Sequence, residues 1–179
     1  MHGQYLIIFN SIITTNHSIM FKQIIFNPIG FIHSPFNDIQ DMPIQPSNGK
    51  GVKGTIELNK EYVEGLKDIE GFSHITLIYY LHKITEAKLL VKPFMDNELH
   101  GIFATRAPVR PNAIGISTVL LLKVENNILH IQDIDILDGT PLLDIKPFFP
   151  QFDNRNAERV GWLTNKENIY NVRSDERFE

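Results

Sequence analysis

The chain has 179 residues, of which 42% are hydrophobic and 21% charged, and a formal net charge of −4. This size and composition predict one folded globular domain and exclude a disordered or fibrous protein. The absence of cysteine excludes disulfides, thiolate nucleophiles and zinc fingers. The acidic balance argues against binding nucleic acid by charge over the whole surface, although a local basic patch remains compatible with it.

The N-terminus holds two short apolar clusters, at residues 5–9 and 12–13, with Asn10 and Ser11 between them. These clusters lack a basic start and a cleavage site, and they are far shorter than the roughly 20 apolar residues of a membrane span. We therefore expect a cytoplasmic protein with no membrane partner. Residues 1–21 are expected to form a weakly ordered leader, and residues 22–179 the folded domain.

Beyond the leader, short runs rich in Ile, Val, Leu, Phe and Thr are broken by Gly, Pro and Asn, which is typical of a β-dominated domain. A hairpin is predicted around Asn126 and Asn127, because asparagine tolerates the left-handed backbone of a tight turn. Helical spacing of apolar residues predicts a helix after Asn59, with Gly71 at its end. In chain order, the predicted elements are strands at 24–31, 51–58, 75–81, 87–91, 100–105, 116–124 and 128–136, a Pro-rich loop at 34–49, and helices at 60–70 and 154–160.

Two common site motifs are unsupported by their context. Residues 49–54 read Gly-Lys-Gly-Val-Lys-Gly, but a dinucleotide-binding turn needs a strand before the glycines and a helix after them. Here a Pro-rich loop precedes and a strand follows, which favours a glycine-rich strand edge. The seven histidines lack an H-E-x-x-H pattern and carboxylates at ligand spacing, so we expect no metal site.

The most informative stretch is 101–117, in which two arginines, Arg106 and Arg110, alternate with Pro108 and Pro111. The prolines fix the backbone, so each guanidinium loses little freedom when it binds a carboxylate or phosphate. Composition alone leaves an ordinary surface turn with solvated arginines equally open. His82 ends an apolar run and so lies at a strand end, where functional side chains often emerge.

A second candidate stretch is 138–147, which begins Asp138-Gly139-Thr140-Pro141. Gly139 frees the backbone and Pro141 fixes its exit, so the carboxylate and adjacent amides are placed to grip a hydroxyl-bearing or cationic ligand. A turn closed by the aspartate side chain is the alternative. We expect this bend and the arginine stretch to meet at one shared cavity.

Taken together, these stretches resemble the TrmO/TsaA-like family, a set of S-adenosylmethionine-dependent tRNA methyltransferases built on a β-barrel. The matching pieces are residues 29–35, 72–74, 103–117 and 138–147. The resemblance implies a mainly β protein with a single compact β-barrel domain and one or two short helices. It also implies a homodimer that methylates N6 of threonylcarbamoyladenosine beside the anticodon of tRNA.

Carried over by position, the resemblance implies a pocket for S-adenosyl-L-methionine and a substrate contact. The substrate carries its own carboxylate, which Arg110 or Lys146 would hold. His82 is the candidate base by residue type. The cofactor pocket would use Pro43, Ile44, Gln45, His82, Lys83, Arg106, Ile116, Asp138, Gly139, Thr140 and Pro141.

The chain departs from the family pattern at several of these places. Ile44 stands where Arg is frequent and cannot supply a charge-assisted hydrogen bond, and Lys83 stands where Gln is frequent. Bacterial members carry a further C-terminal domain. The acidic charge and shorter length favour a non-catalytic S-adenosylmethionine-binding module, whereas the intact arginine stretch favours the enzyme. Methylation of another substrate is a third alternative.

Overall fold

The computed structural model describes residues 7–9, 24–39 and 50–164. The strands are β1 Ile7–Phe9, β2 Ile24–Phe26, β3 Gly30–His33, β4 Lys53–Leu58, β5 His74–Tyr80, β6 Leu90–Val91, β7 His100–Gly101, β8 Ile114–Glu125, β9 Ile128–Gln132 and β10 Thr140–Pro147. The helix is α1 Pro150–Asp153, and 3₁₀ turns occupy Lys60–Leu66, Ile69–Gly71, Ile102–Ala104 and Gly161–Leu163.

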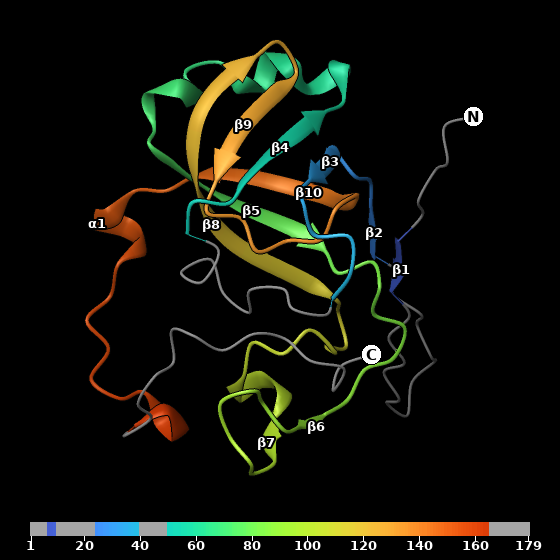
Figure 1. The fold of residues 1–179 in the computed structure, drawn as a ribbon, viewed down its shortest axis with the longest axis vertical. Helices are drawn as coiled ribbons and strands as arrows, with labels where there is room; N and C mark the ends of the chain where they lie inside the picture. Colours follow the sequence, from blue (N-terminus) through green and yellow to red (C-terminus); the bar gives the residue numbers. More distant parts are fainter. Residues whose placement is uncertain (1–6, 10–23, 40–49, 165–179) are drawn as a thin grey trace, which may run out of the picture.

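Within these described residues, six strands close an antiparallel barrel in the order β10, β3, β4, β9, β8, β5 (Figure 1). Inward and outward positions alternate along β5, β8 and β9, as the two-residue period of a strand requires. The barrel is filled with aliphatic side chains such as Ile75, Leu77, Val119, Leu129 and Ile131. The predicted mainly β barrel is therefore confirmed.

A long excursion, residues 81–113, leaves the barrel between β5 and β8 and lies beyond one of its ends (Figure 1). It contains the two-stranded sheet of β6 and β7 and a small core of its own, formed by Val91, Ile102, Ala107 and Val109. The strands predicted at 87–91 and 100–105 are present only as these two-residue pieces. The second core gives the excursion a fixed shape next to the barrel mouth.

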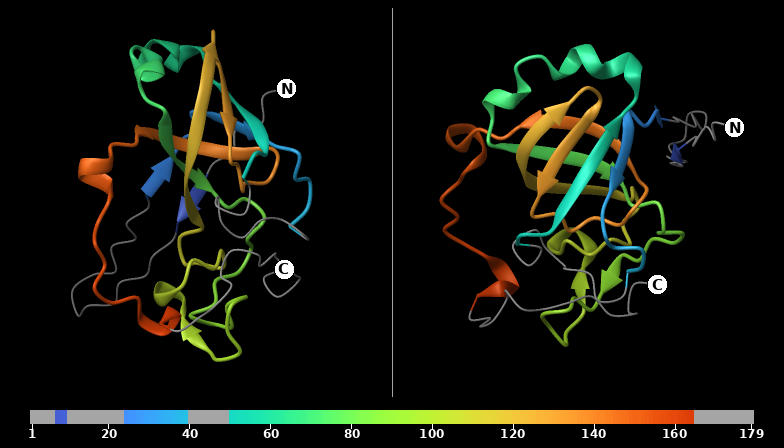
Figure 2. Two further views of the ribbon diagram at one scale, coloured as in Figure 1. Left: turned by 60° about the vertical axis from the view of Figure 1, so that its left-hand side comes forward. Right: turned by 45° about the horizontal axis from the view of Figure 1, so that its top comes forward.

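The chain after α1 runs beside the barrel and returns to the excursion (Figure 2). There the Trp162 Nε1 donates a hydrogen bond to the Ala104 carbonyl at 2.7 Å, and its ring stacks on His100 with centroids 4.5 Å apart. This contact joins the C-terminal part of the described chain to the excursion. No helix among the described residues is long and apolar enough to cross a membrane.

The predicted hairpin is confirmed, with Asn126 at φ 57° between β8 and β9. The β9 strand ends at Gln132 instead of residue 136, because Asp133 adopts φ 66° and leaves the extended conformation. The single strand predicted at 24–31 is two strands, β2 and β3, separated at Pro28. Strand β2 pairs with β1 outside the barrel, whereas β3 pairs with β4 and β10 inside it. The strands predicted at 51–58 and 75–81 are confirmed as β4 and β5.

The helix predicted at 60–70 is present as two 3₁₀ helices instead of one continuous helix, whereas the helix predicted at 154–160 is wrong. Residues 60–71 form two 3₁₀ turns, and Asp68 at φ 68° separates them. The Asn59 side chain does not cap this segment but donates to the Pro28 carbonyl at 3.1 Å. Residues 154–160 are exposed and carry no buried face that would hold a helix, and α1 instead begins at Pro150, a residue suited to a first helical turn.

Of the predicted leader, only Ile7–Phe9 lies in the described part of the chain, where it forms β1. Residues 1–6 and 10–21 lie outside the described residues, so the division of the chain into leader and domain stays a prediction.

Candidate functional site

The arginine stretch is built by a two-residue alternation. Ala107 and Val109 are buried in the second core, while Arg106, Pro108 and Arg110 line a cavity on the other side of the backbone. Pro108 and Pro111 fix their own backbone and restrict the residues before them, Ala107 and Arg110, which holds this arrangement in place. Both predicted guanidinium groups therefore face the same space.

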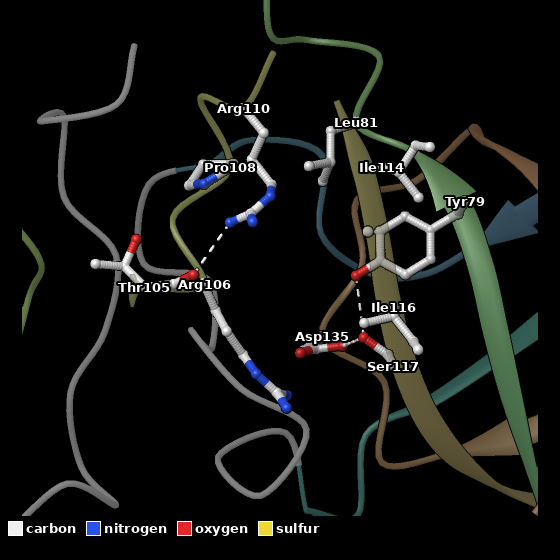
Figure 3. Close-up of a pocket in the computed structure, with 11 residues that line it drawn as sticks. Tyr79, Leu81, Thr105, Arg106, Pro108, Arg110, Ile114, Ile116, Ser117 and Asp135 are labelled. Atoms are coloured by element: carbon white, nitrogen blue, oxygen red, sulfur yellow. Dashed lines mark hydrogen bonds between the residues drawn. The ribbon is translucent and has the colours of Figure 1, made fainter. Parts of the chain in front are cut away.

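This cavity, the larger of two that adjoin each other, has a volume of about 380 Å³. It lies between the end of β5, the start of β8 and the arginine stretch (Figure 3). A Cβ atom at Gly115 would overlap the ring of Tyr79, which lies directly opposite it across the β5–β8 pair. Glycine at this position thus lets the tyrosine ring pack over β8. The cavity is lined by Tyr79, Leu81, Thr105, Arg106, Pro108, Arg110, Ile114, Gly115, Ile116, Ser117 and Asp135.

The two arginines differ in what they already bind. One Arg110 nitrogen donates to the carbonyls of Thr105 at 3.1 Å and Ile102 at 3.3 Å, and the guanidinium carbon lies 5.9 Å from the centre of the Phe103 ring. Arg110 therefore helps to close its own loop. Among the described residues, none accepts a hydrogen bond from the exposed Arg106 guanidinium, which is left available to an anionic ligand.

A chain of hydrogen bonds crosses the wall of this cavity. The Ser117 Oγ donates to the Asp135 Oδ1 at 2.8 Å and lies 3.0 Å from the Tyr79 Oη (Figure 3). Because serine has a single proton and gives it to the carboxylate, the tyrosine hydroxyl is the donor of the second bond. The order of donation is thus Tyr79 to Ser117 to Asp135.

Two groups in this chain of hydrogen bonds, Asp135 and Tyr79, have raised pKa values. Burial raises the pKa of Asp135 to about 6, against the opposing effects of the Ser117 hydrogen bond, a backbone hydrogen bond and the charge of Arg106. Burial, and secondarily the charge of Asp135, also raises the pKa of Tyr79 well above its usual value. The tyrosine thus stays protonated, while the carboxyl exchanges its proton near neutral pH.

A smaller cavity of about 100 Å³ adjoins the first and is mostly apolar. Burial, followed by the charge of Lys83, lowers the pKa of His82, so this imidazole is neutral at pH 7. The Thr140 hydroxyl donates to the Leu137 carbonyl at 2.8 Å and lies 3.4 Å from the His82 Nδ1. The smaller cavity is lined by Ile39, Tyr79, Leu81, His82, Lys83, Ile84, Pro108, Asp135, Ile136, Leu137 and Thr140.

The predicted aspartate bend is held against the segment after β3. The Asp138 Oδ1 accepts a hydrogen bond from the Ser34 backbone N at 3.1 Å and lies 3.4 Å from the His33 Nδ1, and Gly139 takes φ 70°. Thr140 lines the smaller cavity together with Pro108. The bend and the arginine stretch therefore contribute to the same cavity, although the Asp138 carboxylate is occupied by its own turn.

The other predicted site residues are distributed as follows. Ile116 lines the larger cavity, whereas Asp138, Gly139 and Pro141 line neither. Lys146 lies on an exposed face of β10 and pairs with Asp144 at 2.8 Å. Pro43, Ile44 and Gln45 lie outside the described residues.

Sequence reasoning missed the chain of Tyr79, Ser117 and Asp135. Asp135 could not be recognised from its neighbours Ile134 and Ile136, because alternation along the strand predicted at 128–136 places it on the face opposite to theirs. Its partners could not be identified either, because the three residues meet only through the pairing of distant strands.

Known proteins resemble this chain in sequence. The family model described as the tRNA-methyltransferase O N-terminal domain matches residues 31–154 of the chain. A probable S-adenosyl-L-methionine-binding protein of Pyrococcus abyssi is 56% identical over 87% of this chain and 85% of its own length. A mouse tRNA (adenine(37)-N6)-methyltransferase is 34% identical over 71% of this chain but only 31% of its own length.

Solved structures agree with these matches. A crystal structure of TrmO superposes with a TM-score of 0.65 at 41% identity, covering 76% of this chain and 62% of the solved chain. A crystal structure of TrmO from Pseudomonas aeruginosa gives a TM-score of 0.64 at 38% identity and covers 61% of that chain. The chain thus spans about three fifths of these solved proteins.

Proposed function

Because the chain belongs to the family of the tRNA-methyltransferase O N-terminal domain, we propose that it binds S-adenosyl-L-methionine and methylates N6 of threonylcarbamoyladenosine beside the anticodon of tRNA. The name of the Pyrococcus relative supports the binding, and that of the mouse relative supports the reaction. The observation that carries the proposal is the cavity between β5, β8 and the arginine stretch.

The residues of this cavity fit S-adenosyl-L-methionine. A volume of about 380 Å³ lies within the roughly 300–1,000 Å³ range of small-molecule sites. The ligand carries a carboxylate and an aromatic base, and the cavity offers the Arg106 guanidinium and apolar walls from Leu81, Ile114 and Ile116. When bound, it supplies an electrophilic methyl group on a positively charged sulfur.

In this proposal the protein acts mainly by positioning, which supplies several kcal/mol when reacting groups are held in line. Arg106 binds the ligand carboxylate, and His82 and Thr140 orient polar atoms from the smaller cavity. The cofactor-binding set remains Pro43, Ile44, Gln45, His82, Lys83, Arg106, Ile116, Asp138, Gly139, Thr140 and Pro141.

The substrate side is assigned to Arg110 and Lys146. Arg110 lines the larger cavity and would hold the carboxylate of the threonylcarbamoyl group, giving preference for modified over plain adenosine. Lys146 would need to exchange its present partner, Asp144, for the substrate.

The protein is further proposed to act as a homodimer. Large apolar side chains on the excursion and β8 are exposed, among them Leu90, Leu99, Phe103 and Ile116, and a second copy would cover such a surface. Sedimentation equilibrium tests this, and a monomer at micromolar concentration contradicts it.

A non-catalytic S-adenosyl-L-methionine-binding module is the second candidate. It is favoured by the names of two archaeal relatives, the Pyrococcus protein and one from Archaeoglobus fulgidus that is 41% identical over 72% of this chain, both called binding proteins. Methylation of a different substrate is the third candidate.

One experiment separates these three functions. The protein is incubated with S-adenosyl-L-methionine labelled in the methyl group and with bulk tRNA that carries or lacks threonylcarbamoyladenosine, and the nucleosides are analysed by mass spectrometry. Label in N6-methylated threonylcarbamoyladenosine from the modified tRNA alone supports the proposal. Binding by calorimetry without any transfer supports the binding module, and label in another nucleoside supports the third candidate.

A further inference from the structure

The two cavities meet at a shared wall. Four residues line both of them, namely Tyr79, Leu81, Pro108 and Asp135. In the function proposed above, Arg106 in the larger cavity binds the carboxylate end of S-adenosyl-L-methionine, and His82 and Thr140 orient its other end from the smaller cavity. The sulfur that carries the methyl group lies between these two ends of the ligand, and therefore where the cavities join. The groups at this wall therefore lie nearest to the atoms that exchange the methyl group.

Of these four residues, only Asp135 is suited to receive a proton. Leu81 and Pro108 have no titratable group, and the Tyr79 hydroxyl donates its proton to Ser117. The Ser117 Oγ donates a hydrogen bond to the Asp135 Oδ1 at 2.8 Å, and this bond fixes the carboxyl in the shared wall. Figure 3 shows this carboxyl between Ser117 and the Arg106 side of the cavity.

Resting on the function proposed above, we propose that Asp135 is the proton acceptor of the methyl transfer. As the N6 nitrogen forms its bond to the methyl carbon, the bond between that carbon and sulfur breaks and its electron pair stays on the now neutral sulfur. The proton of N6 passes to a carboxylate oxygen of Asp135 and then to water. The acid therefore touches the reacting nitrogen instead of binding a remote part of a ligand.

The electrostatics favour this role. A carboxylate with a pKa of about 6 is a stronger base than an ordinary aspartate and is still mostly ionised at neutral pH. The ionisable groups that face it are Tyr79 from β5, Arg106 and Arg110 from the arginine stretch, and His82 and Lys83 from the smaller cavity. Arg106 is the one cation whose charge contributes to the shift, and it holds the pKa below the value that burial alone would give.

His82, the base candidate from the sequence, is placed less well. It lines only the smaller cavity, and its Nδ1 faces the Thr140 hydroxyl at 3.4 Å. The geometry therefore assigns His82 to orientation of a ligand, and Asp135 to proton transfer.

The test measures single-turnover methyl transfer to tRNA bearing threonylcarbamoyladenosine between pH 5 and pH 9. The variants are Asp135→Asn, His82→Gln and Ser117→Ala, and Asp68→Asn is the matched control. Asp68 is an exposed aspartate at φ 68° on the 3₁₀ turns away from the excursion, where asparagine tolerates the same backbone. Binding of S-adenosyl-L-methionine is measured for each variant by calorimetry.

A second readout does not depend on activity. The carboxyl carbon of Asp135 is followed by ¹³C NMR as pH is varied in the protein without ligand, and it is assigned as the resonance missing from Asp135→Asn. It is expected to titrate near pH 6. In Ser117→Ala the midpoint moves to higher pH, because that hydrogen bond stabilises the ionised form.

If the proposal holds, Asp135→Asn transfers methyl at least a hundredfold more slowly while its affinity for S-adenosyl-L-methionine stays within threefold of the parent. In the parent the rate rises with pH and levels off above the carboxyl pKa, and in Ser117→Ala this rise moves in the same direction as the NMR midpoint. His82→Gln and Asp68→Asn keep the parent pH profile.

Two results overturn the assignment of Asp135 and leave the proposed function standing. One is a rate of methyl transfer by Asp135→Asn within fivefold of the parent rate. The other is a pH-dependent rise in the rate of Ser117→Ala that does not move with its NMR midpoint. Loss of the rise in His82→Gln overturns the assignment in favour of histidine. A parent protein that transfers no methyl group to the modified tRNA overturns the proposed function and the assignment together.

Discussion

The two arginines of the 106–110 segment show how one residue type takes two tasks in the same loop. Arg110 donates to carbonyls of its own loop, whereas the Arg106 guanidinium is exposed and acts electrostatically on Asp135. The sequence indicated both as ligand contacts because Pro108 and Pro111 fix the backbone of the stretch that carries them. The division between them depends on where the loop carbonyls lie, which spacing does not reveal.

Replacing Arg106 by alanine is expected to weaken binding of S-adenosyl-L-methionine about 10- to 100-fold, because a charge-assisted hydrogen bond contributes about 1.5–3 kcal/mol. Isothermal calorimetry measures the change. Arg155→Ala, which removes an arginine from an exposed segment outside both cavities, serves as the control. Equal affinity of Arg106→Ala and the parent would contradict the role given to this residue.

The buried carboxyl of Asp135 is expected to cost stability above its pKa. Its pKa is about 6 in the folded chain and near 3.8 when unfolded, so the folded state binds the proton more tightly. The contribution of this carboxyl to the free energy of unfolding is therefore greatest below about pH 4 and falls by about 2–3 kcal/mol as pH rises through 6. Asp135→Asn escapes this loss and should be the more stable protein at pH 8.

Urea unfolding of the parent and Asp135→Asn at pH 4 and pH 8 measures this difference. A stability gap that is the same at both pH values would mean that the carboxyl is not desolvated in the folded state.

At the scale of elements, the strands with clear alternation were predicted, whereas β10 was missed and the strands at 87–91 and 100–105 are present only as two-residue pieces. The β5 strand and the β8–β9 hairpin follow from inward aliphatic residues and from the two asparagines at the turn. The 60–70 segment is two 3₁₀ helices instead of one continuous helix, because the spacing of Tyr62, Val63 and Leu66 also suits a 3₁₀ helix. Asp68 then reverses the backbone before an α-helix can continue.

The site was predicted only in part for the same reason. The arginine stretch and the aspartate bend are each continuous in sequence, so the residues that form them can be recognised from the sequence alone. The hydrogen-bonded chain of Tyr79, Ser117 and Asp135 depends on how strands distant in sequence lie across the barrel mouth. No local pattern encodes that register.

The β5–β8 pair gives a prediction at this scale. Gly115→Ala is expected to destabilise the protein by about 1–3 kcal/mol, because the added methyl group would overlap the Tyr79 ring and force it off its hydrogen bond to Ser117. Gly101→Ala is the matched control, since no atom lies within 4 Å of its added Cβ. Thermal unfolding compares the two, and equal midpoints would contradict the close packing.

At the scale of the whole molecule, the family resemblance drawn from four short stretches is confirmed by the match over residues 31–154. Two of those stretches, 103–117 and 138–147, contribute residues to the cavities, and the other two lie at the barrel strands β3 and β5. The overall charge of −4 gave no such indication, because a net charge does not say where the charged residues lie.

This charge balance predicts how tRNA binding depends on salt. An acidic protein places few cations against phosphates, so the slope of log affinity against log salt should be no steeper than about −2, which corresponds to roughly three phosphate contacts on a single strand. Fluorescence anisotropy with a labelled anticodon stem-loop, from about 50 to about 200 mM KCl, measures it. A slope near −5 would instead indicate an extended polycationic contact elsewhere on the surface.

The alternation along residues 106–110 also governs which genetic changes the loop tolerates. A substitution at 106, 108 or 110 changes the lining of the cavity, and a substitution at 107 or 109 changes the small core. Each kind of substitution leaves the other region intact. Deleting or inserting one residue between Ala107 and Val109 would shift the phase of the segment, pointing methyl groups at the ligand and a guanidinium into an aliphatic interior. Point substitutions in this segment should therefore change ligand preference among descendants of this chain. Insertions or deletions of one residue should be removed by selection, because they disrupt the cavity and the small core together.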